Sequence, residues 1–413
     1  MSQPSRLHLF QAYGIELEYM IVDKDSLMPK PIADELLKYE LKEYGSDFEN
    51  GMITWSNELV LHVIEIKSTR PEANFSALEN EFAENVKRIN ANLEQWNAML
   101  MPTAAHPLMN PLVDTKLWPH DNNEVYALYD KIFNSKGHGW SNLQSTHLNL
   151  PFYDDEEFAK LHAAIRIVLP ILPALCASSP ILDGKLTGKL NTRLEFYKTN
   201  QSKIPSITGR VIPEAIFSKR LYLNTIYEKI RTDVAPHDPE KILDPVWVNS
   251  RGAIPRFDRG SIEIRIMDIQ ECPSADLAII NLVIEFLKAL VQEKFIPLDQ
   301  QMKIKTETLV PIFDLCVEQG QSAIVYDPAY LEIFEVSNTI TVNELWKVIL
   351  KRLEQINISL SSWEKPEYET LLNQGNLSQR IIKALGRDTS EEKIKSVYRK
   401  LSGCLNQNKM FFL

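Results

Sequence analysis

Aliphatic residues alternate with carboxylates or a histidine in four segments of the sequence, and this alternation restricts the fold more than any other feature. A period of two residues predicts β-strands, because successive side chains of a strand point to opposite faces of a sheet. The four predicted strands are residues 14–22, 58–66, 143–150 and 261–268. Each is apolar enough for burial, yet each places acidic or imidazole groups where an ordinary wet face carries threonine, lysine or glutamine.

The first two strands supply most of the candidate acidic residues. Glu16 and Glu18 share one face of the first strand. Glu58 and His62 share one face of the second strand, whereas ideal pleating sends Glu65 to its opposite face.

The third strand adds His147 and Asn149 on one face, and the fourth adds Glu263 and Arg265. If these faces line one cleft, five glutamates and at least one histidine converge there. Two carboxylates about 4 Å apart repel by about 4 kcal/mol at an effective dielectric constant near 20, so several together need counter-charge. Oxygen ligands with one imidazole suit Mg²⁺ or Mn²⁺, which usually bind phosphate-bearing substrates. The alternative is that each group, taken alone, is a solvated, salt-bridged or core-bonded residue.

Five arginines are candidates for binding phosphate or carboxylate groups: Arg193, Arg251, Arg256, Arg259 and Arg265. The last four lie in a run that leads into and along strand 261–268, so their guanidinium groups can reach the same cleft and form bidentate contacts. Taken singly, each is an ordinary surface arginine.

The rest of the chain is mainly helical in pattern. Apolar residues at steps of three and four predict an amphipathic helix over residues 75–100. We expect a buried helix over residues 155–177, disturbed by its prolines, and loop with short strands over residues 178–213. A further helix is predicted over residues 275–294, and helical periodicity dominates residues 300–413.

Strands at irregular separations, with helices that do not alternate regularly with them, predict an α+β fold with an antiparallel sheet. We expect a core over residues 1–300 and a mainly helical extension over residues 301–413 that packs on this core.

Charge and composition exclude several classes of protein. A net charge of −10 argues against a nucleic-acid partner bound by general phosphate neutralisation. No stretch has the roughly 20 apolar residues of a membrane helix, and the N-terminal residues lack a secretory signal pattern. Four widely spaced cysteines indicate reduced thiols. We therefore expect a cytoplasmic protein with no membrane partner, and the sequence leaves a homo-oligomer open.

Six stretches of the sequence resemble motifs of the glutamate–cysteine ligase type 2 family of carboxylate–amine ligases. They are residues 14–19, 57–66, 102–107, 138–151, 178–180 with Arg193, and 251–268. These motifs follow the family's order over roughly residues 12–290. The resemblance implies a glutamine-synthetase-like fold, in which an antiparallel sheet flanked by helices forms a funnel with metal ions at its floor.

The same resemblance implies roles for the candidate residues. It places Mg²⁺ or Mn²⁺ on Glu16, Glu18, Glu58, Glu65, His147 and Glu263. It implies that Arg265 contacts the terminal phosphates of ATP, with Arg256 and Arg259 as further nucleotide contacts, and that Arg193 lies near substrate or phosphate. Arg265 and Arg193 are thus the expected catalytic residues.

The implied reaction joins a small-molecule carboxylate, expected to be the γ-carboxylate of glutamate, to an amine such as cysteine. ATP phosphorylates the carboxylate, and ADP is released. The amine then attacks the acyl phosphate, and phosphate is released. Two alternatives stay open: a nucleotide- or metabolite-binding protein of this fold without ligase activity, and a phosphotransferase of the same superfold.

Overall fold

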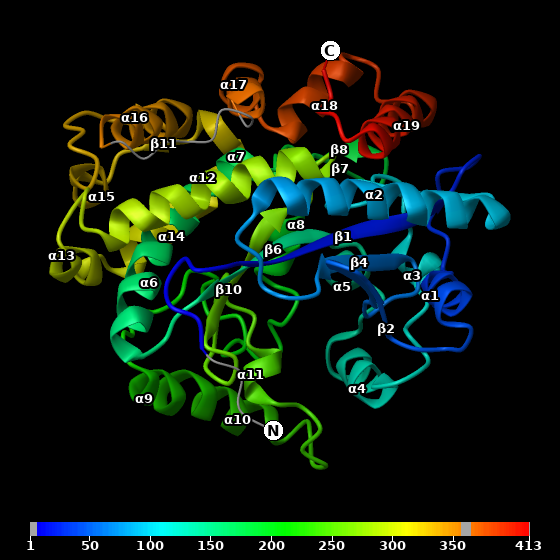
Figure 1. Cartoon of the computed structure of the whole chain (residues 1–413), viewed down its shortest axis with the longest axis horizontal. Coiled ribbons are helices and arrows are strands. Elements are labelled where there is room, and N and C mark those ends of the chain that lie inside the picture. Colours follow the sequence, from blue (N-terminus) through cyan, green and yellow to red (C-terminus); the bar gives the residue numbers. More distant parts are fainter. Residues whose placement is uncertain (1–5, 357–364, 413) are drawn as a thin grey trace.

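The structure is a computed structural model that describes residues 6–356 and 365–412. Its central element is an antiparallel sheet with the strand order β2-β3-β4-β1-β6-β10-β9, and β5 also pairs with β1 (Figure 1). The strands are β1 (Gly14–Asp23), β2 (Asp47–Asn50), β3 (Ile53–Asn57), β4 (Val63–Ser68), β5 (Ala98–Met101), β6 (Ser145–Pro151), β9 (Ala253–Arg256) and β10 (Ser261–Asp268). This arrangement confirms the α+β class with an antiparallel sheet.

Three of the four predicted strands form as the sequence indicates. β1, β6 and β10 agree with segments 14–22, 143–150 and 261–268 to within two residues at each end. The aliphatic face of β10 is fully buried, as Ile262, Ile264 and Ile266 are 0% exposed. Burial of this face fixes the register, because a slip by one residue would turn every side chain to the opposite face.

The prediction of one strand over residues 58–66 is wrong. β3 ends at Asn57 and β4 begins at Val63, so the residues between them form the turn of a hairpin. Glu58 therefore comes from a turn, and the expectation that pleating separates it from Glu65 does not apply. The turn contains the β-forming residue Val60 and the apolar residue Leu61, and both are buried inside the protein although they belong to no strand.

The predicted helix over residues 75–100 is too long. α2 ends at Leu93, a short 3₁₀ turn follows, and residues 98–101 form β5 on β1. Asn97 adopts a left-handed conformation with φ of 51°, which reverses the chain between helix and strand.

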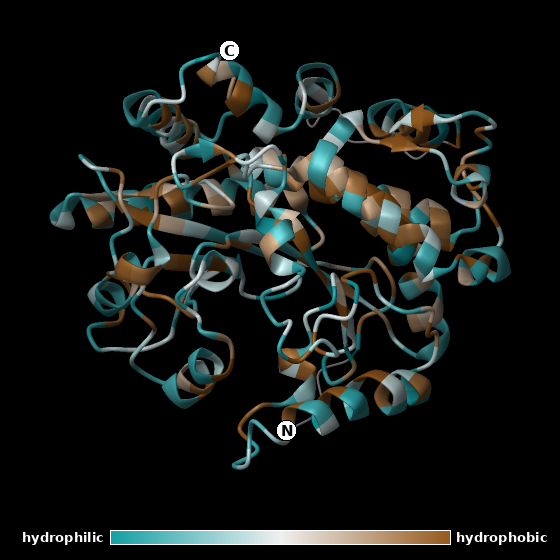
Figure 2. Ribbon diagram, turned by 180° about the vertical axis from the view of Figure 1, so that it is seen from behind, coloured by the Kyte–Doolittle hydropathy of each residue, from teal (hydrophilic) through white to brown (hydrophobic). Residues whose placement is uncertain are grey.

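Helices cover both faces of the sheet. α2 (Phe75–Leu93) and α12 (Pro273–Val291) lie across one face, with α6 (Asp155–Val168) beside them (Figure 1). α12 is hydrophobic over most of its surface and buried over most of its length (Figure 2). α4 (Asn123–Phe133), α9 (Lys219–Tyr222), α10 (Glu228–Val234) and α11 (Pro245–Val248) lie on the other side of the sheet (Figure 1). The remaining α-helices before α12 are α1 (Ala33–Leu41), α3 (Pro111–Asp114), α5 (His138–Ser141), α7 (Pro173–Cys176) and α8 (Thr192–Tyr197).

The last third of the chain is mainly helical, as predicted. Its helices are α13 (Leu298–Lys303), α14 (Thr306–Gln319), α15 (Pro328–Glu332), α16 (Val342–Gln355), α17 (Lys365–Gln374), α18 (Leu377–Leu385) and α19 (Glu391–Gln407). Two short two-stranded sheets complete the described strands: β7 (Ile181–Leu182) with β8 (Lys185–Leu186), and β11 (Ile324–Val325) with β12 (Ile340–Thr341). None of the helices within the described ranges has both the length and the apolar character of a membrane span.

A buried ion pair ties this last third to the sheet. Glu271, three residues beyond β10, accepts hydrogen bonds from the guanidinium of Arg380 in α18 and from the backbone N–H of Phe411. The Arg380 guanidinium also donates to the carbonyl of Phe411 over 2.8 Å. Both side chains of the pair are 0% exposed.

Candidate active site

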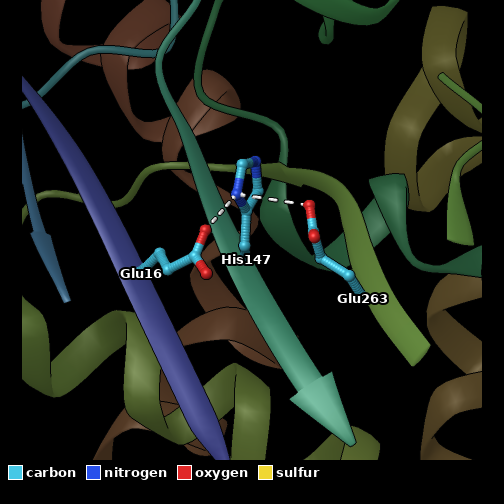
Figure 3. A group of neighbouring side chains, drawn as sticks. All are labelled: Glu16, His147 and Glu263. Atoms are coloured by element: carbon cyan, nitrogen blue, oxygen red, sulfur yellow. Dashed lines mark hydrogen bonds and ion pairs between the residues drawn. The ribbon is translucent and has the colours of Figure 1, made fainter. Parts of the chain in front are cut away.

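Three neighbouring strands place an imidazole between two carboxylates. Glu16 in β1 pairs with His147 in β6. Glu263 in β10 pairs with Asn149, which lies two residues beyond His147 on the same face of β6. The His147 Nδ1 lies 2.8 Å from Glu16 Oε2 and 3.9 Å from Glu263 Oε1 (Figure 3). One ligand atom from each of these three side chains lies within 4.8 Å of the other two. Carboxylate oxygens and one imidazole fit the donor set expected for Mg²⁺ or Mn²⁺.

Glu18 extends this acidic group along β1. Its Oε1 lies 3.8 Å from His147 Nε2, and its Oε2 accepts hydrogen bonds from the backbone N–H and the hydroxyl of Ser145. The Ser145 hydroxyl also lies 2.9 Å from His147 Nε2. These contacts hold the carboxylate of Glu18, whose side chain is only 10% exposed, beside the imidazole.

Glu58 and Glu65 line the same cleft from the opposite side of β1. Glu65 is the direct partner of Glu18 in the pairing of β4 with β1. Its Oε2 lies 2.9 Å from Nζ of Lys67, which also lines the cleft. The structure therefore brings all six predicted metal-binding residues to one cavity, and it places His62 elsewhere, buried with Nε2 on the carbonyl of Ser141.

The acidic residues perturb one another's pKa values in opposite directions. Burial opposes ionisation of Glu16, but the hydrogen bond and charge of His147 lower the pKa of Glu16 to about 2. Burial and the charge of Glu18 raise the pKa of Glu58 to about 7. Burial and the charge of Glu16 raise the pKa of Glu65 well above its ordinary value. The cluster thus lacks the positive charge needed to ionise all its carboxylates at neutral pH.

The predicted arginines differ in their relation to the cleft. Arg265 lines it and donates to Glu263 through Nε at 3.1 Å, with its Nη2 at 2.9 Å from the same carboxylate. Arg256 also lines the cleft, and its Nη1 lies 3.8 Å from Glu263. Arg259 lies at the rim with a side chain that is 66% exposed. Arg193 lines the cleft from α8.

Arg251 does not line this cleft. Its guanidinium forms a bidentate pair with Glu214 at 2.6 and 2.8 Å and donates to the carbonyl of Ser206. Its role in the structure is to hold the loop before β9.

Several cleft residues were not predicted from the sequence. They are Lys67, Tyr126, Tyr129, Trp140, Tyr197, Asn200 and Trp247. The rings of Tyr129, Trp140 and Trp247 form one wall: Tyr129 packs edge-on against both indoles, with centroids 5.2 and 5.0 Å apart. Aromatic residues at helical spacing are ordinarily core residues, so the sequence alone did not indicate that these aromatic residues line a cleft.

The cleft has a volume of about 390 Å³ and adjoins a larger cavity of about 1220 Å³. Glu16, Lys67, Val246 and Arg259 line both cavities. The larger cavity adds apolar surface from Leu223, Tyr227 and Phe257, and basic side chains from Arg6, Arg70 and Lys219. The acidic cluster thus lies where two connected cavities meet.

Comparison with known proteins identifies the family. Residues 12–400 match the glutamate-cysteine ligase family 2, and the chain belongs to this family. The match extends well beyond residue 290, where the motifs recognised in the sequence end. An uncharacterized protein of Archaeoglobus fulgidus is 34% identical over 409 residues, which cover 96% of this chain and 99% of that protein.

Two solved ligase structures share the fold. The bifunctional glutathione synthetase from Pasteurella multocida matches with a TM-score of 0.64 and 12% identity over 97% of this chain, which spans 53% of that protein. The glutamate–cysteine ligase from Francisella tularensis, solved in complex with AMP, matches with a TM-score of 0.61 and 13% identity over 95% of this chain and 88% of that protein. At these identities the likeness concerns the fold alone.

Proposed function

We propose that this protein is an ATP-dependent ligase that joins a carboxylate to an amine through an acyl phosphate. The observation that carries the proposal is the convergence of Glu16, His147 and Glu263 in one cleft with Arg265 at its side. Carboxylate attack on a phosphoryl group brings anions together, so catalysis depends on neutralising and positioning charge. Membership of the ligase family supports the same reaction class.

Mg²⁺ or Mn²⁺ fits the acidic residues of the cleft. Glu16, His147 and Glu263 would hold one ion, and Glu18, Glu58 and Glu65 offer further oxygen ligands. When bound, such ions neutralise phosphate charge and orient the γ-phosphoryl group. Their charge also removes the mutual repulsion that raises the pKa values of Glu58 and Glu65.

We assign the arginines by their positions. Arg265, beside Glu263, would contact the terminal phosphates of ATP, and Arg256 and Arg259 would contact the nucleotide from the rim. The larger cavity, lined by Tyr227 and Phe257, would take the base and ribose, because its apolar surface suits a planar ring. Arg193 would contact the substrate in the smaller cleft.

The proposed reaction has two steps. An oxygen of the substrate carboxylate attacks the γ-phosphorus and ADP leaves, and the amine nitrogen then attacks the acyl carbon and phosphate leaves. The ammonium form of the amine must first lose a proton, which a cleft carboxylate can accept. The γ-carboxylate of glutamate and the amine of cysteine are the substrates we propose to test first.

The test is release of ADP by the purified protein with ATP, Mg²⁺, glutamate and a panel of amines. Ligation requires that ADP and phosphate appear only when the acid and an amine are both present. Release of AMP would exclude the acyl-phosphate route. ADP release with one acceptor and no amine would indicate a phosphotransferase, and ATP binding without turnover across the panel would indicate a binding protein.

We further propose that residues 1–300 form the catalytic core and that residues 301–413 act as its support. The cleft residues all lie before residue 266, whereas α16 and α17 pack on α12 and α19 packs on α2 (Figure 1). The buried pair of Glu271 with Arg380 joins the two parts.

A further inference from the structure

Lys67 lies where the cleft and the larger cavity meet. Within the described residues, Lys67 and Arg259 are the two basic side chains that line both cavities. The side chain of Arg259 is 66% exposed, whereas that of Lys67 is 34% exposed. A ligand that extends from the larger cavity to the acidic cluster crosses this junction, and Lys67 is the more buried of the two cations that it meets there.

The register of the sheet places Lys67 beside the acidic cluster. Lys67 of β4 is the direct partner of Glu16 in β1, and Glu65, two residues earlier in β4, is the partner of Glu18. Residues two apart in a strand share one face of the sheet, so Lys67 faces the cleft together with Glu65. Directly opposed residues have Cβ atoms about 5 Å apart. The side chain of Lys67 therefore starts beside that of Glu16, a proposed metal ligand.

Two carboxylates hold the ammonium group of Lys67. Its Nζ lies 2.9 Å from Glu65 Oε2 and 3.5 Å from Asp47 Oδ1. Glu65 is also a proposed metal ligand, so a divalent ion and the ammonium group compete for the same carboxylate. Two positive charges about 4 Å apart repel by about 1 kcal/mol even in water and by more in a partly buried site. An ion bound to Glu65 therefore drives the ammonium group away from it.

The side chain of Lys67 has the freedom to turn from Glu65 toward the larger cavity. Lysine carries its charge on a flexible four-carbon stem and offers three rotatable donors. Asp47, the second carboxylate that holds it, has a side chain that is 59% exposed, so water weakens this attraction. A phosphate group at the junction offers stronger partners, because its oxygens accept charge-assisted hydrogen bonds.

We propose that Lys67 is a phosphate-binding residue, and that Glu65 holds its ammonium group until a divalent ion binds to that carboxylate. The released ammonium group donates to the terminal phosphates of the nucleotide where they cross the junction. The inference rests on the proposed function, which places a nucleotide in the larger cavity and its γ-phosphate at the acidic cluster. Arg265, held by Glu263 on β10, and Lys67, held by Glu65 on β4, then approach the same phosphates from the two sides of the cluster.

The test measures two affinities by calorimetry: that of Mn²⁺ alone, and that of a non-hydrolysable ATP analogue in saturating Mg²⁺. Lys67→Met removes the charge and keeps most of the length of the side chain. This variant should bind Mn²⁺ about 5-fold more tightly, because the competing ammonium group is absent. It should bind the analogue about 10-fold more weakly, because a charge-assisted hydrogen bond is lost. A distorted cleft would lower both affinities, so changes in opposite directions exclude a merely structural effect.

Two further variants complete the test. Lys67→Arg keeps the positive charge and should bind the analogue more tightly than Lys67→Met does. Lys30→Met removes an ammonium group that is paired with Asp23 over 3.1 Å, on a side chain that is 28% exposed and lines neither cavity. It should change neither affinity. Binding of the analogue that is unchanged in Lys67→Met, or Mn²⁺ binding that is unchanged or weaker, would overturn the proposal.

ADP release with an acid and an amine separates this proposal from the proposed function. Turnover by the wild type, with the same KM for ATP in Lys67→Met, would overturn the role of Lys67 and leave the ligase. The two opposite changes in affinity, with no ADP release by the wild type for any acid and amine, would overturn the ligase and leave the role of Lys67.

Discussion

Glu18 of β1 lies directly opposite Glu65 of β4 in the antiparallel pairing, and both residues line the cleft although their side chains are only 10% and 9% exposed. Like charges at opposed positions destabilise a sheet. The metal ions proposed for this cleft would supply the positive charge that the pair lacks.

Metal ions should therefore stabilise the protein. Mg²⁺ or Mn²⁺ at about 100 times its Kd should raise the free energy of unfolding by about 2.7 kcal/mol, measured as a rise in Tm. Glu65→Gln should reduce that rise and leave the metal-free protein about as stable as the wild type, since burial and the charge of Glu16 raise the pKa of Glu65 and already favour its uncharged form. Glu354→Gln, at an exposed position of α16, is the control. A wild-type Tm that does not respond to either ion would contradict the assignment.

Substitution of the central ligands should abolish activity without unfolding the chain. Glu16→Gln and Glu263→Gln each remove a charge from the group around His147 and should lower metal affinity at least about 100-fold. ADP release and metal titration measure the two effects, and circular dichroism checks the fold. Wild-type turnover in both variants would remove Glu16 and Glu263 from the site.

The buried pair of Arg193 with Asp268 should be the most sensitive stability contact of the cleft. Asp268→Asn removes the charge that compensates the guanidinium and weakens the bonds from Ser178 and Ser179, so we expect a loss of about 3–5 kcal/mol in urea unfolding. Asp299→Asn, which breaks an exposed pair with Lys303, should change stability little. Equal effects of the two substitutions would show that burial does not set the energy of the Arg193 pair.

His162 should make the protein sensitive to acid. Burial and the charge of Arg166 lower the pKa of His162 to about 3, whereas an unfolded histidine titrates near 6.5. Between these values the unfolded chain binds more protons, so the free energy of unfolding falls as the pH drops. At pH 5 the loss from this residue is about 2 kcal/mol.

His162→Phe should reduce this acid sensitivity. The ring lies among Phe158, Phe217 and Tyr222, so phenylalanine suits the site. The difference in Tm between pH 7 and pH 5 should be smaller in the variant than in the wild type. An identical difference in both proteins would assign the acid sensitivity to other groups.

The strands that carry the acidic residues could be predicted, because the alternation of aliphatic and charged residues within each strand is a local feature of the sequence. Glu16, His147 and Glu263 lie on strands whose opposite faces are aliphatic, so burial of one face sets the direction of the other. The chain's membership of the ligase family, inferred from its motifs, is confirmed over residues 12–400.

The errors arose where long-range contacts decide local structure. Residues 98–101 continue the apolar spacing of α2, but pairing with β1 makes them a strand. Glu58 reaches the cleft from a hairpin turn. The β-forming residues around it led to the prediction of a continuous strand instead of this turn. Trp140 lines the cleft because Gly139 lets α5 approach Asn200, a contact between segments about 60 positions apart that no spacing reveals.

The position of Glu271 has a consequence for synthesis of the chain on the ribosome. Glu271 leaves the ribosome more than 100 residues before Arg380 and Phe411, the groups that bond its carboxylate in the finished protein. Until those residues are synthesised, the carboxylate lacks both of the groups that bond it in the folded protein, and a buried charge without a partner is strongly unfavourable. A chain that ends before residue 380 therefore lacks both partners of this carboxylate.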